Sequence, residues 1–123
     1  MEMIGLTHTS EMKVTDGVTA ITMGSGDMPV LATPAMMALM ENAAMLAVAD
    51  HLPEGCTTVG GQISASHLKP TPVGETVAAT AVVTRAEGKK IEFKITAHWG
   101  DVLLGEGTHL RFIVDKEKFM SRL

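Results

Sequence analysis

The sequence is poor in cysteine and in aromatic residues, and both shortages restrict what the chain can be. It holds one cysteine, so no disulfide can form within the chain, and we expect a reducing, cytoplasmic location. Aromatic residues make up 3% of the chain, whereas hydrophobic residues make up 46%, so aliphatic side chains and methionine must fill the core. The length of 123 residues suits one domain and is too short for two, so we treat residues 1–123 as a single domain.

Basic clusters, long apolar runs and metal-binding motifs are also missing. The net charge is −4, and no run of basic residues exceeds Lys89-Lys90, which argues against a surface for nucleic acid. The longest apolar segment is too short for a membrane span and contains an acid, and the first ten residues do not resemble a secretory signal. HExxH spacings and phosphate-binding loops are absent. We therefore expect no nucleic-acid or membrane partner, no metal and no cofactor.

The apolar segment 34–49 contains only two polar residues, Glu41 and Asn42. Pro34 favours the start of a helix with Thr33 as its N-cap, and the helix should end at about residue 50. A helix that is apolar on all sides must be covered by protein. We therefore expect Glu41 to be enclosed, where an unpaired carboxylate costs several kcal/mol. The competing interpretation places Glu41 beside Asn42 at a solvated rim, without a role.

Alternating apolar and polar residues predict strands on both sides of this helix. One strand is expected within residues 13–23, and four more at residues 58–67, 77–83, 91–99 and 102–114. Gly100-Asp101 is typical of a tight hairpin turn between the last two strands. This order predicts an α+β fold in which a curled, antiparallel, five-stranded sheet packs around one long helix.

Few polar side chains point inward on this interpretation: Thr33 at the helix start, Glu41 two turns later, and His67 on a strand. A hydroxyl, a carboxylate and an imidazole can together carry acyl chemistry. Thr33 and Glu41 lie about 12 Å apart along a helix, so they can share a cleft only with substrate or His67 between them. Each residue also has an ordinary alternative, since Thr33 can serve as a cap and His67 as a hydrogen-bonded strand residue.

Two further pairs of residues are candidates for binding substrate. Adjacent glycines such as Gly60 and Gly61 weaken a strand unless a group must approach its backbone, and an amide there can hold a carbonyl oxygen. A bulge without function is the alternative. His109 and Arg111 place two basic groups on one face of a strand of small residues, where phosphate or carboxylate can bind.

Several stretches together resemble the hotdog-fold thioesterases, and within them the fluoroacetyl-CoA thioesterase group. These stretches are Val30-Leu31-Ala32-Thr33, Leu39-Met40-Glu41, His67 followed by Pro70-Thr71-Pro72-Val73-Gly74, Ala97-His98 and Gly105-Glu106-Gly107-Thr108-His109. The resemblance implies a homodimer with active sites at the subunit interface, with a dimer of dimers as an alternative. It also implies metal-free hydrolysis of a short acyl-CoA, with Thr33, Glu41 and His67 as catalytic residues and Gly60 positioning the carbonyl.

One segment departs from the pattern of this family. The fluoroacetyl-specific enzyme has phenylalanines in the loop before the catalytic threonine, where they form a lid over the acyl group. This chain has Gly24-Ser25-Gly26-Asp27-Met28-Pro29 there instead. We therefore expect an acyl-CoA thioesterase for a different small acyl group. The alternatives are a hotdog-fold enoyl-CoA hydratase or dehydratase, and a non-catalytic acyl-CoA-binding dimer module.

Overall fold

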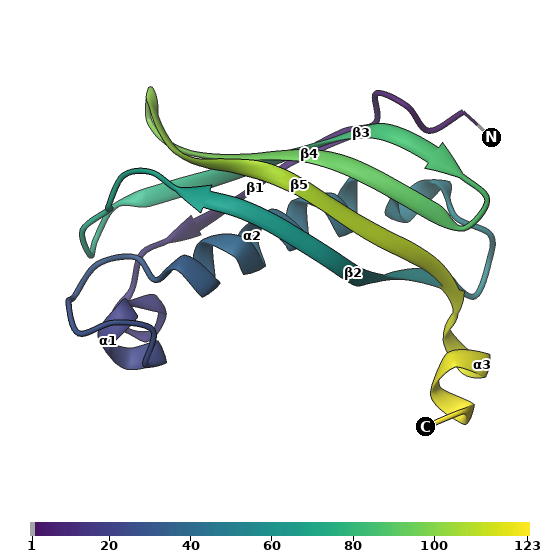
Figure 1. Ribbon diagram of the computed structural model, residues 1–123, viewed down its shortest axis with the longest axis horizontal. Coiled ribbons are helices and arrows are strands. Elements are labelled where there is room, and N and C mark those ends of the chain that lie inside the picture. Colours follow the sequence, from purple (N-terminus) through teal and green to yellow (C-terminus); the bar gives the residue numbers. More distant parts are fainter. Residues whose placement is uncertain (1) are drawn as a thin grey trace.

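The computed structural model describes residues 2–123 as a curled antiparallel sheet that arches over one long helix (Figure 1). The strands are β1 (Thr7–Lys13), β2 (Cys56–His67), β3 (Thr76–Glu87), β4 (Lys90–Trp99) and β5 (Val102–Asp115). The long helix is α2 (Thr33–Val48), and the short helices are α1 (Ala20–Met23) and α3 (Lys116–Ser121). Single 3-10 turns occupy Asp16–Val18 and Ala49–His51. The predicted α+β class, with five antiparallel strands and one long helix, is confirmed.

The strands follow the order β1-β3-β4-β5-β2, and all neighbours are antiparallel. The hairpin predicted at Gly100-Asp101 joins β4 to β5. β2 forms one edge of the sheet, so one side of its backbone has no strand beside it within residues 2–123. Because Cys56 pairs with Asp115 and His67 with Gly105, the two ends of β2 lie at opposite ends of the sheet.

The strand predicted within residues 13–23 is wrong. β1 ends at Lys13, and the chain continues through a 3-10 turn into α1. The Thr19 side chain accepts a hydrogen bond from the Thr22 amide and so caps α1. Threonine can offer the backbone this local hydrogen bond in place of a strand ladder, and the alternation of apolar residues does not reveal that choice.

The start of α2 also differs from the prediction. Ala32 is the N-cap and Thr33 is the first helical residue, so Thr33 does not cap the helix. α2 packs chiefly against β1 and β3. A stripe of the helix that includes Ala38 and Leu46 is exposed in the single chain. Asn42 is also exposed, and its Oδ1 accepts a hydrogen bond from Ser10 of β1 at 2.7 Å. The sheet therefore covers only one side of this apolar helix.

The core between α2 and the sheet is mainly aliphatic, as the composition predicts. Alternate residues of β3 and β4 face the helix, with Phe93 as the one aromatic ring among the buried core residues. Each Å² of apolar surface removed from water contributes about 25 cal/mol, so this layer supplies much of the stability that holds both ends of α2 in place. Among residues 2–123, no helix has both the length and the apolar character that crossing a membrane requires.

Candidate active site

Thr33 and His67 form a hydrogen-bonded pair at one end of the sheet. The Oγ1 of Thr33, the first residue of α2, lies 2.7 Å from the Nδ1 of His67, the last residue of β2. Burial lowers the pKa of His67, and contact with the Lys69 backbone opposes this shift. The imidazole is therefore mainly neutral near pH 7, and its Nδ1 can accept the hydroxyl proton.

The other ring nitrogen of His67, Nε2, has no hydrogen-bond partner among the described residues. When Nδ1 accepts from the Thr33 hydroxyl, Nε2 carries the ring hydrogen. Nε2 is also buried. A buried polar atom without a partner is costly. Because Nε2 is closed to solvent, Nδ1 is the ring nitrogen that is placed to exchange a proton beside Thr33.

A cleft of about 320 Å³ opens beside the Thr33–His67 pair. It lies between α1, the segment that leads into α2, and the segment that follows β2. Its lining residues are Ala20, Ser25, Val30, Leu31, Thr33, His67, Leu68, Lys69 and Pro70. Most of these are apolar, and none is phenylalanine, tyrosine or tryptophan. Apolar walls with a few polar groups are typical of small-molecule sites.

Glu41 belongs to a second cluster, in the middle of β2 and β5. Its Oε2 lies 4.0 Å from Arg111 Nη1, and a Cβ placed on Gly60 would be 2.9 Å from the same oxygen. The Glu41 side chain is 42% exposed, whereas that of Arg111 is 8% exposed. The expectation that Glu41 is enclosed is therefore wrong for the single chain, since its carboxylate is partly open to solvent.

Arg111 is held by the protein through three hydrogen bonds. Its Nε donates to Thr58 Oγ1 at 2.8 Å, and its Nη2 donates to the Thr58 carbonyl at 3.0 Å. Its Nη1 lies 3.1 Å from His109 Nε2. Thr58 was not among the predicted site residues, because alternation places it on the polar face of its strand. The structure buries it, since the bulge between Gly60 and Gln62 shifts the alternation. These bonds fix the guanidinium beside Glu41 and leave few of its donors for a substrate.

His109 accepts from Arg111 because its other nitrogen is already engaged. Its Nδ1 lies 2.7 Å from the Gln62 carbonyl, so Nδ1 donates and Nε2 is the acceptor for the guanidinium. Burial lowers the pKa of His109, the hydrogen bond with Gln62 opposes the shift, and the charge of Arg111 adds to it. His109 therefore stays neutral near pH 7, and its Nε2 accepts a hydrogen bond from Arg111 Nη1.

The adjacent glycines form a bulge in β2. Gly60 pairs with Arg111 and Gln62 with Leu110, so Gly61 is the extra residue. A Cβ on Gly61 would collide with the Phe112 ring, whereas the missing side chain of Gly60 makes room for the Glu41 carboxylate. Both glycines thus permit a close approach to the backbone.

The two clusters lie apart within one chain. Two turns of α2 separate Thr33 from Glu41 by about 12 Å, and the length of β2 separates Gly60 from His67 by about 23 Å. The fold therefore joins Thr33 to His67 and Glu41 to Arg111, but it does not join Glu41 to His67. Within residues 2–123, no group of three or more His, Cys, Asp or Glu side chains is placed to hold a metal ion.

The curled antiparallel sheet around one long helix is the hotdog fold. A hot-dog-like protein from Thermanaerovibrio acidaminovorans has the same fold, with a TM-score of 0.86 and 24% identity over 97% of this chain and 88% of that chain. The model of the fluoroacetyl-CoA-specific thioesterase family matches residues 14–117. The chain therefore belongs to that family and is a thioester hydrolase, as the resemblance implied.

Two relatives show how far the similarity extends. The fluoroacetyl-CoA thioesterase of Streptantibioticus cattleyicolor is 37% identical over 94 residues, which cover 76% of this chain and 68% of that protein. A threonine-to-serine variant of a fluoroacetyl-CoA thioesterase, solved in complex with acetyl-CoA, is 30% identical with a TM-score of 0.92. That likeness covers 99% of this chain and 96% of the variant's chain.

Proposed function

We propose that the protein hydrolyses a small acyl-CoA thioester to the free acid and coenzyme A. The observation that carries this proposal is the 2.7 Å contact between Thr33 Oγ1 and His67 Nδ1 beside an apolar cleft. A nucleophile in hydrogen-bond contact with a neutral base is the arrangement that acyl transfer needs. The names of the relatives support the thioester of coenzyme A as the substrate class.

His67 acts as the general base in this mechanism. Its Nδ1 takes the proton of the attacking oxygen, which belongs either to Thr33 or to a water molecule held by Thr33 and Glu41. The oxygen attacks the thioester carbonyl, and the backbone of Gly60 and the N-terminus of α2 stabilise the oxyanion. When the carbon–sulfur bond breaks, the thiolate of coenzyme A takes the proton from His67.

The two routes differ in one intermediate. If Thr33 is the nucleophile, an acyl ester forms on its oxygen and a water molecule then hydrolyses it. If water attacks directly, Thr33 is never acylated. Quenching the reaction during turnover and measuring the mass of the peptide that carries Thr33 separates these routes.

The acyl group that we propose is small but is not specifically fluoroacetyl. The segment 24–29 between α1 and α2 brings Ser25 to the cleft, and it has no aromatic residue that could cover the acyl group. We expect fluoroacetyl-CoA to be hydrolysed no better than acetyl-, propionyl- or butyryl-CoA. Measuring kcat/KM for all four substrates checks this expectation.

We further propose a homodimer in which two β2 strands pair edge to edge. The free edge of β2 and the uncovered side of α2 support it, because both features call for a partner. Antiparallel pairing centred between Ile63 and Ser64 would set the partner's His67 opposite Gly60. The Thr33–His67 pair of one subunit would then face Glu41 of the other. A dimer of dimers is the alternative assembly.

We also propose a cytoplasmic location, which the single cysteine supports.

Replacement of Glu41 tests the proposed mechanism. We expect Glu41→Gln to lower kcat by about 100-fold or more and to leave the midpoint of thermal unfolding nearly unchanged, because the side chain is partly exposed. Release of free thiol from a panel of acyl-CoA substrates is the measurement. Asp50→Asn is the matched control, since Asp50 is an exposed acid beyond the same helix. Undiminished turnover by Glu41→Gln would contradict the role of the carboxylate. The thiol measurement also separates hydrolysis from hydration of an enoyl-CoA, because hydration releases no thiol.

A further inference from the structure

The cleft beside Thr33 and His67 contains two polar side chains that the proposed chemistry does not use, Ser25 and Lys69. Ser25 belongs to the segment between α1 and α2, and Lys69 follows the last residue of β2 by two positions. Both residues are exposed in the single chain. A pocket with mainly apolar walls orients and selects its ligand through the few polar groups that it contains. These two side chains are therefore placed to select the acyl group.

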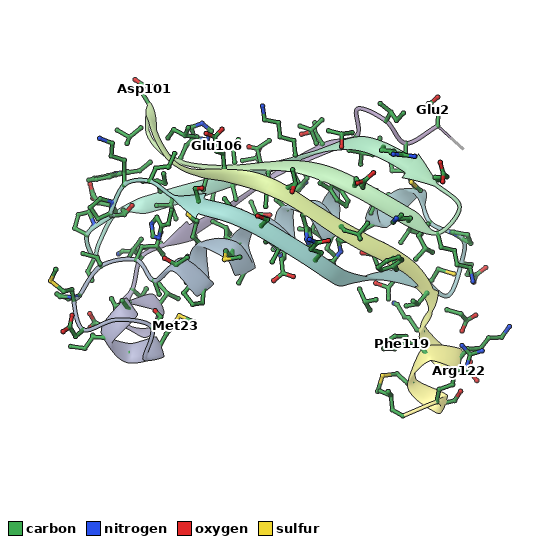
Figure 2. The ribbon with its side chains drawn as sticks, viewed as in Figure 1. Glu2, Met23, Asp101, Glu106, Phe119 and Arg122 are labelled. Carbon is green, nitrogen blue, oxygen red and sulfur yellow. The ribbon has the colours of Figure 1, made fainter. Side chains whose placement is uncertain are left out.

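Lys69 gives this cleft a positive charge, although the chain as a whole is acidic. The chain has 14 acidic and 10 basic residues, yet none of the described residues that line the cleft is an aspartate or a glutamate. Lys69 forms no ion pair within residues 2–123. Other cations lie far away, and Figure 2 shows Arg122 of α3 at the end of the molecule opposite to Met23 of α1. An anionic group that enters the cleft thus meets one free cation and no acid.

Lys69 also lies close to the atoms that react in the proposed mechanism. Its backbone is a neighbour of the His67 ring, and Nδ1 of that ring lies 2.7 Å from the Thr33 hydroxyl. A lysine carries its charge on a flexible four-carbon stem, so the ammonium can turn from this backbone position into the cleft. The anion that it meets must therefore lie only a short distance beyond the thioester carbonyl.

We propose that Lys69 and Ser25 form a subsite for a carboxylate at the far end of the acyl group, so that the substrate is the coenzyme A thioester of a short dicarboxylic acid. Lys69 supplies the charge, and the Ser25 hydroxyl donates a second hydrogen bond to the carboxylate. The apolar walls at Ala20, Val30 and Leu31 contact the methylene groups between the carboxylate and the thioester. This inference rests on the proposed hydrolysis of acyl-CoA, and it names the class of the acyl group.

Succinyl-CoA and butyryl-CoA test this subsite, because their acyl chains have the same number of carbons and differ only in a terminal carboxylate or methyl group. The measurement is thiol release, corrected for the spontaneous hydrolysis of each thioester. We expect the wild-type kcat/KM to be at least about tenfold higher for succinyl-CoA, since charge-assisted hydrogen bonds hold its carboxylate. Lys69→Met keeps a long side chain without the charge and should abolish this preference, whereas Lys69→Arg should retain it.

Two further variants complete this test. Lys13→Met is the matched control, because Lys13 is an exposed lysine outside the cleft, and it should keep the wild-type ratio of the two kcat/KM values. Ser25→Ala removes one hydrogen bond and should lower this ratio about threefold. An unchanged ratio in Ser25→Ala would contradict the assignment of Ser25 to the subsite.

Other outcomes would overturn the subsite as a whole. One is a wild-type protein that hydrolyses butyryl-CoA as well as succinyl-CoA, or better. Another is an equal loss for both substrates in Lys69→Met, which would assign Lys69 to the coenzyme A part that the two thioesters share or to the interface between subunits.

Failure of the proposed function remains distinguishable from failure of this subsite. If the wild-type protein releases thiol from neither substrate above the spontaneous rate, the proposed hydrolysis is refuted, and calorimetry with the two intact thioesters then tests the subsite alone. Binding of succinyl-CoA that is at least about tenfold tighter than that of butyryl-CoA, and that loses this advantage in Lys69→Met, supports the subsite. Equal binding of the two thioesters, or binding of neither, overturns it.

Discussion

In the proposed mechanism, the hydrogen bond between Thr33 and His67 makes turnover depend on an unprotonated imidazole. Burial lowers the pKa of His67 below its ordinary value of 6.5, so the ring remains neutral until the pH falls below that value. We expect the acid limb of a plot of kcat/KM against pH to lie below pH 6.5. Rates of thiol release between about pH 5 and about pH 8 check this expectation. An acid limb above 6.5 would contradict it, and His67→Asn should remove that limb along with most of the activity.

Substitutions of the neighbouring residues Gly60 and Gly61 should affect different properties, the first activity and the second stability. A Cβ on Gly60 would lie 2.9 Å from a Glu41 carboxylate oxygen, which is the end of a flexible side chain and can move. We expect Gly60→Ala to lower kcat about tenfold or more because the carboxylate is displaced. We also expect it to change the free energy of unfolding by less than about 1 kcal/mol.

Gly61→Ala should show the opposite behaviour, because its Cβ would collide with the Phe112 ring. We expect it to destabilise the protein by about 1–3 kcal/mol. Urea unfolding and thiol release measured on both variants separate the two effects. Full activity in Gly60→Ala would show that the position of the Glu41 carboxylate against the backbone is unimportant.

Among the elements, the strands after α2 could be predicted from the sequence and the segment before it could not. Alternation with a period of two residues is visible in each later strand, and β3 and β4 bury one face accordingly. Glycines mark the turns. Between β1 and α2 the conformation depends on specific contacts, and the alternation of apolar and polar residues does not reveal them. Thr19 caps α1 and also forms an isolated bridge with Leu31, and this bridge brings together residues that are distant in the sequence.

The close pairing of β2 with β5 depends on a glycine. A Cβ on Gly107 would press into the backbone of Ser64 and would lie 2.7 Å from Ala65 Cα. Because backbone cannot move aside as a side chain can, we expect Gly107→Ala to destabilise the protein by about 2 kcal/mol. The change should also lower activity, since it displaces β2 and with it His67.

Chemical unfolding and thiol release measure both consequences of Gly107→Ala. Thr108→Ala is the matched control, because Thr108 is the exposed neighbour on the same strand. A Gly107→Ala protein as stable as the wild type would show that the two strands can separate without cost.

At the scale of the whole molecule, the sequence identifies the kinds of residue in the site but not their grouping. Periodicity indicates which face a side chain occupies, whereas distances follow from how elements far apart in the chain pack. Thr33 and His67 meet because the start of α2 packs against the end of β2. Glu41 lies two turns further along α2, so it meets Arg111 of β5 instead of His67. One chain therefore holds two separate clusters, which the proposed dimer would join.

Mixing two inactive variants tests whether the site is shared between subunits. Thr33→Ala and Glu41→Gln would each disable a different half. A mixed dimer would then contain one intact site and one doubly altered site. If the proteins are unfolded and refolded together in equal amounts, half of the dimers are mixed, so thiol release should recover to about a quarter of the wild-type rate. Mixing Thr33→Ala with His67→Asn is the control, and it should restore nothing because both changes affect the same half. If the first mixture also stays inactive, each site lies within one chain, and the carboxylate of Glu41 must act there without reaching the imidazole of a partner.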